Sequence, residues 1–281
     1  MSRYYRQLVE RFGYTWSSDA VGSISSGLTL PEVSDGKGGY LWITTATSPG
    51  SGQLKPPAGC TSVSIECWGG GGAGGSVVKD GAFPNGAAGG AGGSYAFAEF
   101  EITEGQTIYY FVGSKGTGST ASSTNGKRIN GTQSWINLVS NTKPTTLSQG
   151  ILAVGGQGGQ SRHTDAILPG IGTTAGCIGE VVFAGGNGAT GSNTQSGGGG
   201  GGATYSGNGR NANGTIGGNQ GGAGRTISGN GNMGIFWYLS PGAGGSGALL
   251  KDGLAGSYLG GNGSDGKIIF YWGTHLYPIV R

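Results

Sequence analysis

The residues that could perform acid–base or nucleophilic chemistry are few and scattered in this sequence. His163 and His275 are the two imidazoles, and neither lies near a Gly-x-Ser-x-Gly turn that would present a serine nucleophile. Asp165 follows His163 by two residues, which is also the pattern of an exposed polar loop. The sequence therefore predicts no catalytic residue of the serine-hydrolase type.

Paired carboxylates are the second chemistry to consider, because two acidic side chains can hydrolyse glycosidic bonds. The glutamates available for such a pair are Glu66, Glu99, Glu101, Glu104 and Glu180. Those that lie on expected strands are expected to face solvent. This alternative stays open, but we expect the protein not to be an enzyme.

Phosphate and metal sites also lack the required spacing. Residues 261–267 imitate a phosphate-binding loop, but Ile268 stands where a Ser or Thr must reach magnesium, and the strand follows the lysine instead of preceding the loop. Cys60, Cys67 and Cys177 form neither a zinc motif nor a disulfide framework. We expect no cofactor and no bound metal.

The composition excludes several classes of protein. Of 281 residues, 68 are glycine and only 10% are charged, with 16 basic and 13 acidic side chains. This balance offers no basic surface for nucleic acid, and no stretch approaches the ~18 apolar residues of a membrane span. Twenty-six aromatic residues (12 Tyr, 8 Phe and 6 Trp) argue against intrinsic disorder. Long helices are disfavoured, because each interior glycine costs roughly 0.5–1 kcal/mol relative to alanine.

The fold expected is all-β: a jelly-roll-like antiparallel β-sandwich over residues 51–154, completed by residues 265–281. Segments 48–52 and 56–59 are interpreted as turns, and 103–106 as the turn of a hairpin. Residues 107–112 are aromatic and β-branched throughout, as in a fully buried strand. The expected strands cover residues 40–45, 61–68, 94–102, 107–112, 134–139, 151–154 and 267–272.

Residues 1–50 are interpreted as an attachment segment. Tyr5, Leu8, Val9 and Phe12 fall at helical spacing on one side of a possible short helix. That helix either docks on a larger assembly or packs on its own domain, and both readings stay open. No apolar signal core follows the basic N-terminus.

Residues 155–264 contain 38 of the glycines and only seven charged residues. A flexible linker is one interpretation. The other is a packed array of polyglycine II helices, which have three residues per turn, make no internal hydrogen bonds, and can bond to neighbours on all sides. We favour the array, because apolar stretches such as 178–183 interrupt the glycines and the last strand must return to the sandwich.

The aromatic run Phe236, Trp237 and Tyr238 interrupts the glycines most conspicuously. It either fills a buried place against the sandwich or forms an exposed patch that binds a partner. Phe83 and His163 lie in similar interruptions. If the protein recognises a receptor, we expect these five residues to contact it, because a glycine array itself offers almost no side chains.

The strand at 63–68 followed by Gly69–Gly72, then 89–96, 105–113 and the run 197–204, resembles glycine-rich domains of bacteriophage tail proteins. It is similar also to the glycine-rich module of anaplastic-lymphoma-kinase-type receptors, which joins a jelly-roll-like sandwich to polyglycine helices. The resemblance implies a tail-fibre or tail-tip adhesin whose loops, held by a glycine scaffold, bind a host receptor.

The resemblance sets the remaining expectations. The chain is expected in the virion, made in the host cytoplasm, with other tail proteins and a host-surface protein or glycan as partners. A homo-oligomer is expected, with a trimer favoured, and neither nucleic-acid binding nor membrane insertion is expected. The alternative is a purely structural virion component of the tail, collar or capsid decoration.

Overall fold

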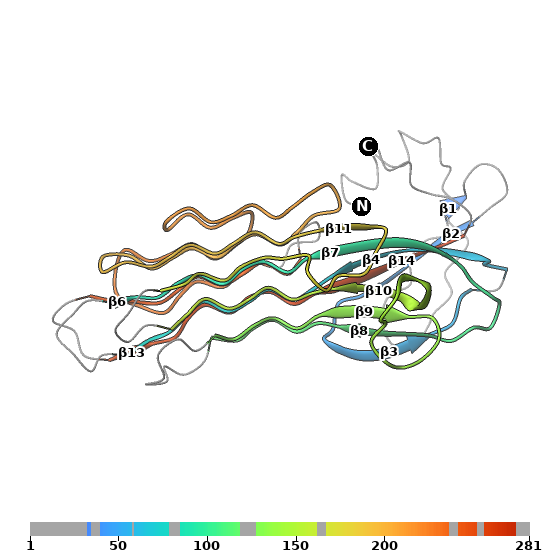
Figure 1. Ribbon diagram of the computed structural model, residues 1–281, viewed down its shortest axis with the longest axis horizontal. Coiled ribbons are helices and arrows are strands. Elements are labelled where there is room, and N and C mark those ends of the chain that lie inside the picture. Colours follow the sequence, from blue (N-terminus) through green and yellow to red (C-terminus); the bar gives the residue numbers. More distant parts are fainter. Residues whose placement is uncertain are drawn as a thin grey trace.

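The computed structural model describes residues 33–34, 40–57, 59–78, 85–118, 128–161, 167–235, 241–251 and 256–273. These residues form an elongated body, with a β-sandwich at one end and long irregular segments that run side by side to the other end (Figure 1). The fold is all-β. The described part of the chain holds a single 3₁₀ turn, η1 (Leu147–Gln149), and contains no helix long and apolar enough to cross a membrane.

The sandwich consists of two antiparallel sheets. The larger has the order β1-β2-β14-β4-β7-β11, and the smaller has the order β10-β9-β8-β3. The larger sheet contains β1 (Val33–Ser34), β2 (Tyr40–Ala46), β14 (Lys267–Trp272), β4 (Ser62–Trp68), β7 (Tyr95–Glu101) and β11 (Val181–Phe183). The smaller contains β10 (Gly150–Ala153), β9 (Ser134–Asn137), β8 (Ile108–Val112) and β3 (Gly50–Leu54).

The core lies between these sheets because alternate strand residues point inward. On β4 the inward residues are Val63, Ile65 and Cys67, and β14 adds Phe270 and Trp272, whose rings are nearly parallel at 5.5 Å between centroids. Each of these side chains is almost completely buried. The last strand, β14, pairs with β2 on one side and with β4 on the other. The chain thus returns to the sandwich, as expected.

Two expectations about turns are right only in part. The segment 103–106 does form a turn, with Gln106 N–H donating to the Thr103 carbonyl at 3.0 Å. However, β7 and β8 lie in different sheets, so they do not form a hairpin. The physical reason is that Ile102 and Ile108, on either side of the turn, are both buried between the sheets. The expected turn at 48–52 begins with a bend at Ser48 and Pro49, but Gly50, Ser51 and Gly52 belong to edge strand β3, which pairs with β8.

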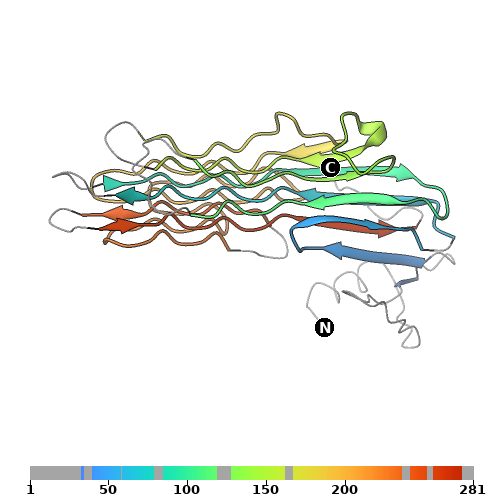
Figure 2. The same ribbon diagram turned by 90° about the horizontal axis from the view of Figure 1, so that it is seen from below.

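The central strands continue directly into the irregular segments, as Figure 2 shows from below. β4 runs on into residues 69–76, and β8 runs on into residues 113–118. Residues 87–94 lead into β7, and residues 260–266 lead into β14. The glycine segments therefore include parts of the range 51–154 as well as residues 155–264.

Residues 69–75 show how these segments pack. Their backbone N–H groups donate in turn to three neighbours, with every third donor returning to the same one. Gly69, Gly72 and Gly75 donate to residues 88–94; Gly70 and Ala73 donate to 129–132; Gly71 and Gly74 donate to 261–264. A period of three and outward-pointing N–H groups are the properties of polyglycine II.

The carbonyls of the same segment accept from three further neighbours, around Gly116, from Gly156 to Gly159 and from Gly245 to Ala248. Residues 69–75 therefore have six hydrogen-bonded neighbours and are fully buried. We call this segment the glycine hub. Its glycines are required by close approach: a Cβ on Gly70, Gly71, Gly72 or Gly74 would lie against the backbone carbonyl of the adjacent segment.

The end of the body opposite the sandwich is closed by two short strand pairs (Figure 1). β12 (Leu249–Leu250) pairs with β6 (Asn85–Gly86), and β13 (Ser257–Tyr258) pairs with β5 (Val77–Val78). A small apolar cluster of Val77, Ala87, Ala248 and Leu250, with Tyr258 packed on it, fills the space between them. At this end of the body, apolar side chains pack against one another, whereas in the array the backbones of the glycine segments pack directly.

Candidate functional site

Side-chain amides complete the hydrogen bonding at the outer edge of the glycine array. The Asn187 Oδ1 accepts from the Gly172 N–H at 2.9 Å, while the Asn187 N–H donates to Asn211 Oδ1 at 2.7 Å. The same role, accepting a neighbour's backbone N–H, belongs to Asn130, Asn208, Asn230, Asn262, Gln157 and Gln160. These amides supply carbonyl oxygens where no further polyglycine segment packs. Five of these asparagines, Asn130, Asn187, Asn208, Asn230 and Asn262, are followed by glycine. The repeated Asn-Gly dipeptide is therefore a sequence signal for most of them, although its meaning is visible only once the array is known.

The outer face of the larger sheet carries a second polar group, centred on Glu66. Tyr95 Oη donates to Glu66 Oε1 at 2.9 Å, and Tyr271 Oη donates to Glu66 Oε2 at 2.7 Å. Only 8% of Glu66 is exposed, so the expectation that glutamates on strands face solvent is wrong for Glu66, although it holds for Glu99 and Glu101 on β7. The reason is that both faces of β4 are buried. The alternation of polar and apolar residues along this strand therefore does not predict which side chains are exposed to solvent.

Lys267 lies near this carboxylate and is fully buried. Its ammonium lies 5.7 Å from the centroid of the Trp68 ring, within the range of a cation–π contact. Burial lowers the pKa of Lys267 to about 8, although the charge of Glu66 acts in the opposite direction. Burial also raises the pKa of Glu66, against the lowering effects of Tyr271, Tyr95 and Lys267. Both charges are therefore stabilised by each other and penalised by desolvation.

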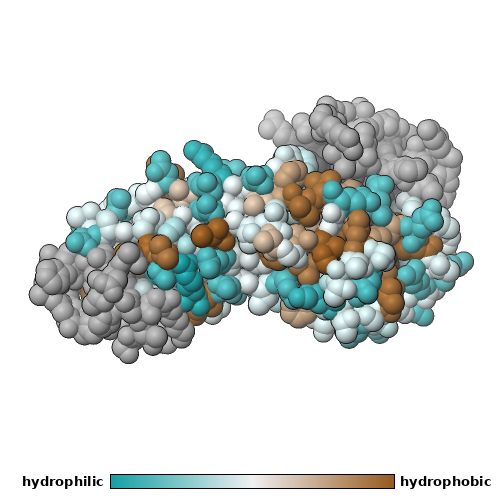
Figure 3. Space-filling model, in the orientation of Figure 1, coloured by the Kyte–Doolittle hydropathy of each residue, from teal (hydrophilic) through white to brown (hydrophobic). Residues whose placement is uncertain are grey.

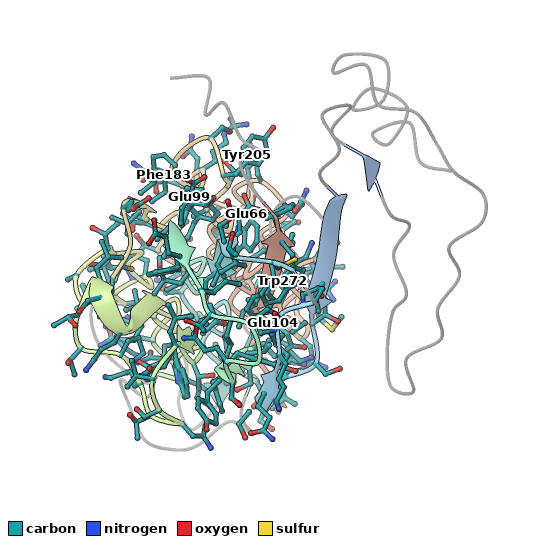
Figure 4. The ribbon with its side chains drawn as sticks, turned by 90° about the vertical axis from the view of Figure 1, so that its right-hand side faces the viewer. Glu66, Glu99, Glu104, Phe183, Tyr205 and Trp272 are labelled. Carbon is teal, nitrogen blue, oxygen red and sulfur yellow. The ribbon has the colours of Figure 1, made fainter. Side chains whose placement is uncertain are left out.

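The Glu66 group connects the sandwich to the array. Beside it, Trp68 Nε1 donates to the Ala203 carbonyl at 3.1 Å, at the end of the glycine run 197–202. Both carboxylate oxygens of Glu66 accept hydrogen bonds from tyrosines. We therefore interpret this group as a structural contact between the sandwich and the array and not as a proton-transfer site. Figure 4 shows Glu66, Glu99, Phe183 and Tyr205 on one side of the sandwich end, away from Glu104.

The other glutamates do not assemble around Glu66. Glu99 is exposed and accepts from Ser64 Oγ at 3.2 Å, and Glu101 and Glu104 are exposed too. In the described ranges, no three His, Cys, Asp or Glu side chains gather closely enough to hold a metal ion. All three cysteines are free, and Cys177 Sγ lies 3.0 Å from Ser94 Oγ.

A hollow of about 620 Å³ opens where the outer face of the smaller sheet meets the glycine array. Its lining consists of Phe111, Gly131, Thr132, Gln133, Trp135, Val154 and Gly155. Figure 3 shows hydrophobic residues gathered at the sandwich end of the face seen in Figure 1, among hydrophilic ones. A second hollow, of about 500 Å³, lies along β4 and β7 between Thr61 and Ile102 and includes Glu99 and Glu101.

The hollow corrects the interpretation of residues 107–112 as a fully buried strand. Ile108 and Val112 are buried, but Tyr109, Tyr110 and Phe111 are only partly so. Tyr110 packs against the core, with 6.0 Å between the centroids of its ring and that of Phe270. On the outer face of the smaller sheet, Phe111 is partly buried and Trp135 beside it is 8% exposed. Sequence reasoning missed Phe111 and Trp135 as site residues because an aromatic run does not reveal which face of a strand is covered.

The residues that the sequence proposed for receptor binding lie outside the described part of the chain. This applies to Phe83, His163, Phe236, Trp237 and Tyr238. It applies also to the docking residues Tyr5, Leu8, Val9 and Phe12. The neighbouring Ile235, which is described, is 59% exposed, and its N–H donates to the Gln220 carbonyl at 2.8 Å. Both sets of roles stay predictions.

Comparison with known proteins agrees with this architecture. A comparison with curated proteins gives no match. The sequence profile of one family, described as a glycine-rich domain, matches residues 44–273, which covers the described sandwich from within β2 to the end of β14 together with the array between them. The chain therefore belongs to the glycine-rich domain family.

Proposed function

We propose that this protein is a bacteriophage tail component, a tail-fibre or tail-tip adhesin, that holds recognition residues on a rigid glycine scaffold. The observation that carries the proposal is the glycine hub: a segment with six hydrogen-bonded neighbours whose interior is made of backbone. An interior of this kind has no side chains with which to bind a ligand. Its value is rigidity, so chemical selectivity must come from the residues that interrupt it.

Rigidity favours binding for a physical reason. A side chain that is already held in place loses little entropy when a partner binds, and large aromatic side chains contribute much apolar area at low entropy cost. Phe236, Trp237 and Tyr238 are the densest aromatic group among the interruptions. We propose that they contact the host receptor, and that the part of residues 1–50 that precedes β2 attaches the protein to other tail proteins as one of several symmetric copies, a trimer being favoured. Residues 40–46 are excluded from this attachment segment because they form β2, which pairs with β14 in the larger sheet.

The test is binding of the purified, fluorescently labelled protein to a panel of bacterial strains. We expect wild-type protein to label a subset of strains. Trp237→Ala is expected to weaken labelling about thirtyfold, as for a hot-spot aromatic that contributes ~2 kcal/mol. Tyr205→Ala is the matched control, because Tyr205 is an aromatic residue that is 49% exposed and lies in a turn of the array.

The thermal unfolding temperature of each variant distinguishes a binding role from a packing role. Loss of labelling with an unchanged unfolding temperature supports recognition by Trp237. A large fall in unfolding temperature would mean that Trp237 belongs to the core and would contradict its role in binding. If the wild-type protein labels no strain, the adhesin role is wrong and the purely structural virion role replaces it.

A further inference from the structure

We propose that Asn213 is a site of spontaneous deamidation, at which an exposed turn of the glycine array gains a negative charge that the sequence does not encode. Asparagine followed by glycine is the dipeptide most prone to this reaction, because glycine has no side chain to hinder it. The asparagines that precede a glycine and whose side chains the structure describes are Asn130, Asn187, Asn208, Asn213, Asn230 and Asn262. Their hydrogen bonds separate Asn213 from all the others.

The reaction requires a free backbone nitrogen and a free side-chain amide. The nitrogen of the glycine loses its proton to solvent and attacks the asparagine Cγ. The new C–N bond closes a succinimide ring, while the Cγ–Nδ2 bond breaks and the departing group takes a proton and leaves as ammonia. Water then opens the ring at either carbonyl, which gives aspartate or isoaspartate. A glycine N–H or an asparagine amide that is held by another group therefore slows the first step.

The array holds both groups at every one of these positions except Asn213. The glycine N–H groups donate to carbonyls of other segments at 2.8–3.0 Å: Gly131 to Gly156, Gly188 to Gly170, Gly209 to Ala184, Gly231 to Leu259 and Gly263 to Gly116. The Oδ1 atoms of the preceding asparagines accept backbone N–H groups at 2.7–2.9 Å. The nitrogen and the amide are each bonded to another group and cannot react with each other until those bonds break.

Neither group is held at Asn213. The backbone of Asn213 exchanges two hydrogen bonds with Ile216, each of 2.9 Å, which closes a tight turn with Gly214 at a φ of +56°. Gly214 is tied to the array through its carbonyl, which accepts from the Gly198 N–H at 2.8 Å. In the part of the chain that the structure describes, neither the Gly214 N–H nor the Asn213 side chain has a hydrogen-bond partner.

Solvent exposure does not explain the difference. Asn130, Asn208 and Asn230 are exposed, as is Asn213, so water reaches all of them. What differs is the opening that the reaction needs. At Asn213 the backbone bends toward the amide once the turn's own hydrogen bonds to Ile216 open, whereas at Asn208 bonds between separate segments must break first.

The turn can also accept the product. Isoaspartate carries the chain through its side-chain carbonyl and so lengthens the backbone by one methylene. In a straight glycine segment, the extra methylene would shift every later residue out of the three-residue hydrogen-bond repeat. At Asn213 it falls in a turn between two segments. We therefore expect the deamidated protein to keep the unfolding temperature of the wild type.

The experiment is incubation of the purified full chain in mildly alkaline buffer, once folded and once denatured in guanidinium chloride, followed by tryptic mass spectrometry. The denatured sample gives the intrinsic reaction rate of each asparagine. Cleavage after Arg210 and Arg225 places Asn213 in a peptide with no other Asn-Gly pair and separates it from Asn208. Digestion at mildly acidic pH and a sample without incubation control for deamidation during preparation.

Asn208 is the matched comparison, because it is exposed, precedes a glycine and lies close to Asn213 in the sequence. We expect folding to slow the reaction of Asn208 at least about tenfold, which corresponds to ~1.4 kcal/mol. Folding should leave Asn213 within about threefold of its denatured rate, because no array bond protects it. Asn213→Gln should remove the deamidated form of this peptide, because glutamine would have to close a larger ring.

The proposal is overturned if Asn213 reacts no faster than Asn208 in the folded protein, or if folding slows Asn213 as much as it slows the asparagines that the array holds. It is overturned also if those asparagines react as fast in the folded protein as in the denatured chain, because their hydrogen bonds would then give no protection. A lower unfolding temperature after deamidation at Asn213 would contradict the inference that the turn accepts the product.

Discussion

At the scale of single residues, Lys267 and Glu66 are the least expected feature of this molecule. A fully buried lysine and a buried carboxylate lie on the outer face of a sheet whose pattern suggested solvent. Each charge is desolvated, and neither would be tolerated without its partners: the two tyrosine hydroxyls on Glu66 and the Trp68 ring beside Lys267. The cost of burying Lys267 can be measured through pH.

The pKa of Lys267 predicts how stability varies in mildly alkaline solution. The folded protein lowers this pKa from 10.5 to about 8, so between these values the unfolded chain binds more protons than the folded one. The free energy of unfolding should therefore rise with pH from 8 to 10.5, by about 1–3 kcal/mol in total for this group. Below pH 8 lysine is charged in both states, and the penalty is present in full.

Urea unfolding of the wild type and of Lys267→Met at several pH values across this window tests the prediction. The difference between the two proteins isolates Lys267 from other titrating groups. We expect the rise with pH to be smaller in the variant by the amount due to Lys267. Parallel pH profiles for the two proteins would show that the lysine titrates as it does in the unfolded chain.

At the scale of elements, the glycine segments are held together by backbone contact, so the effect of a methyl group depends on its place. Gly74 lies in the glycine hub, where a Cβ would meet the Ser246 carbonyl and would lie 2.7 Å from the Gly247 nitrogen. Gly207 is the matched control, because a Cβ there meets nothing within 4 Å and its φ is not positive. Glycine-to-alanine substitution at these two positions therefore distinguishes the destabilising effect of a steric clash from the effect of glycine's greater backbone flexibility in the unfolded chain.

Gly74→Ala is expected to destabilise the protein by at least ~3 kcal/mol, because backbone cannot move aside as a flexible side chain can. Gly207→Ala is expected to be neutral or to stabilise by up to ~1 kcal/mol, since alanine has less unfolded-state entropy to lose. Urea unfolding of the two variants measures the difference. Failure of Gly74→Ala to fold while Gly207→Ala folds agrees with the prediction, whereas equal stabilities contradict it.

The sequence predicts the elements better than their arrangement. Strands such as 62–68 and 267–272 follow from β-branched and aromatic runs, which are local signals. The crossing of the chain between sheets at 102–108 is not local, because it depends on the burial of Ile102 and Ile108 between two sheets whose other strands are distant in the sequence. The aromatic hollow could not be foreseen for a similar reason: Phe111 and Trp135 are 24 positions apart and meet only through the register of β8 and β9.

At the scale of the whole molecule, sandwich and array form one continuous body. Strands β4, β7, β8 and β14 pass without a break into glycine segments, so the sheet hydrogen bonds and the array hydrogen bonds lie on the same chains. Neighbours in the array also come from distant parts of the sequence: Gly74 N–H donates to the Gly261 carbonyl at 2.9 Å. A local opening of the array must therefore break contacts with several segments at once.

This connectivity predicts that the array unfolds together with the sandwich. Native-state hydrogen exchange at increasing urea concentration can compare the amides of Gly71, Gly72 and Gly74 in the glycine hub with those of Ile65 and Cys67 in β4. Because successive hub residues bond to different neighbouring segments, we expect both groups to exchange only through global unfolding, with the same free energy of opening.

The outer segments provide the comparison within the same experiment. The Thr204–Gly207 turn bonds mainly within itself, with N–H to carbonyl distances of 3.0 and 3.3 Å, so its amides are expected to exchange through smaller openings. Hub amides that exchange as fast as this turn would mean that glycine segments are held only loosely. The proposed role of the array as a rigid scaffold would then lose its physical basis, whichever ligand the protein binds. Equal opening energies for hub and β4 would instead show that the glycine hub resists opening as strongly as the sandwich core, because hydrogen bonds to six neighbours replace the packing that side chains provide elsewhere.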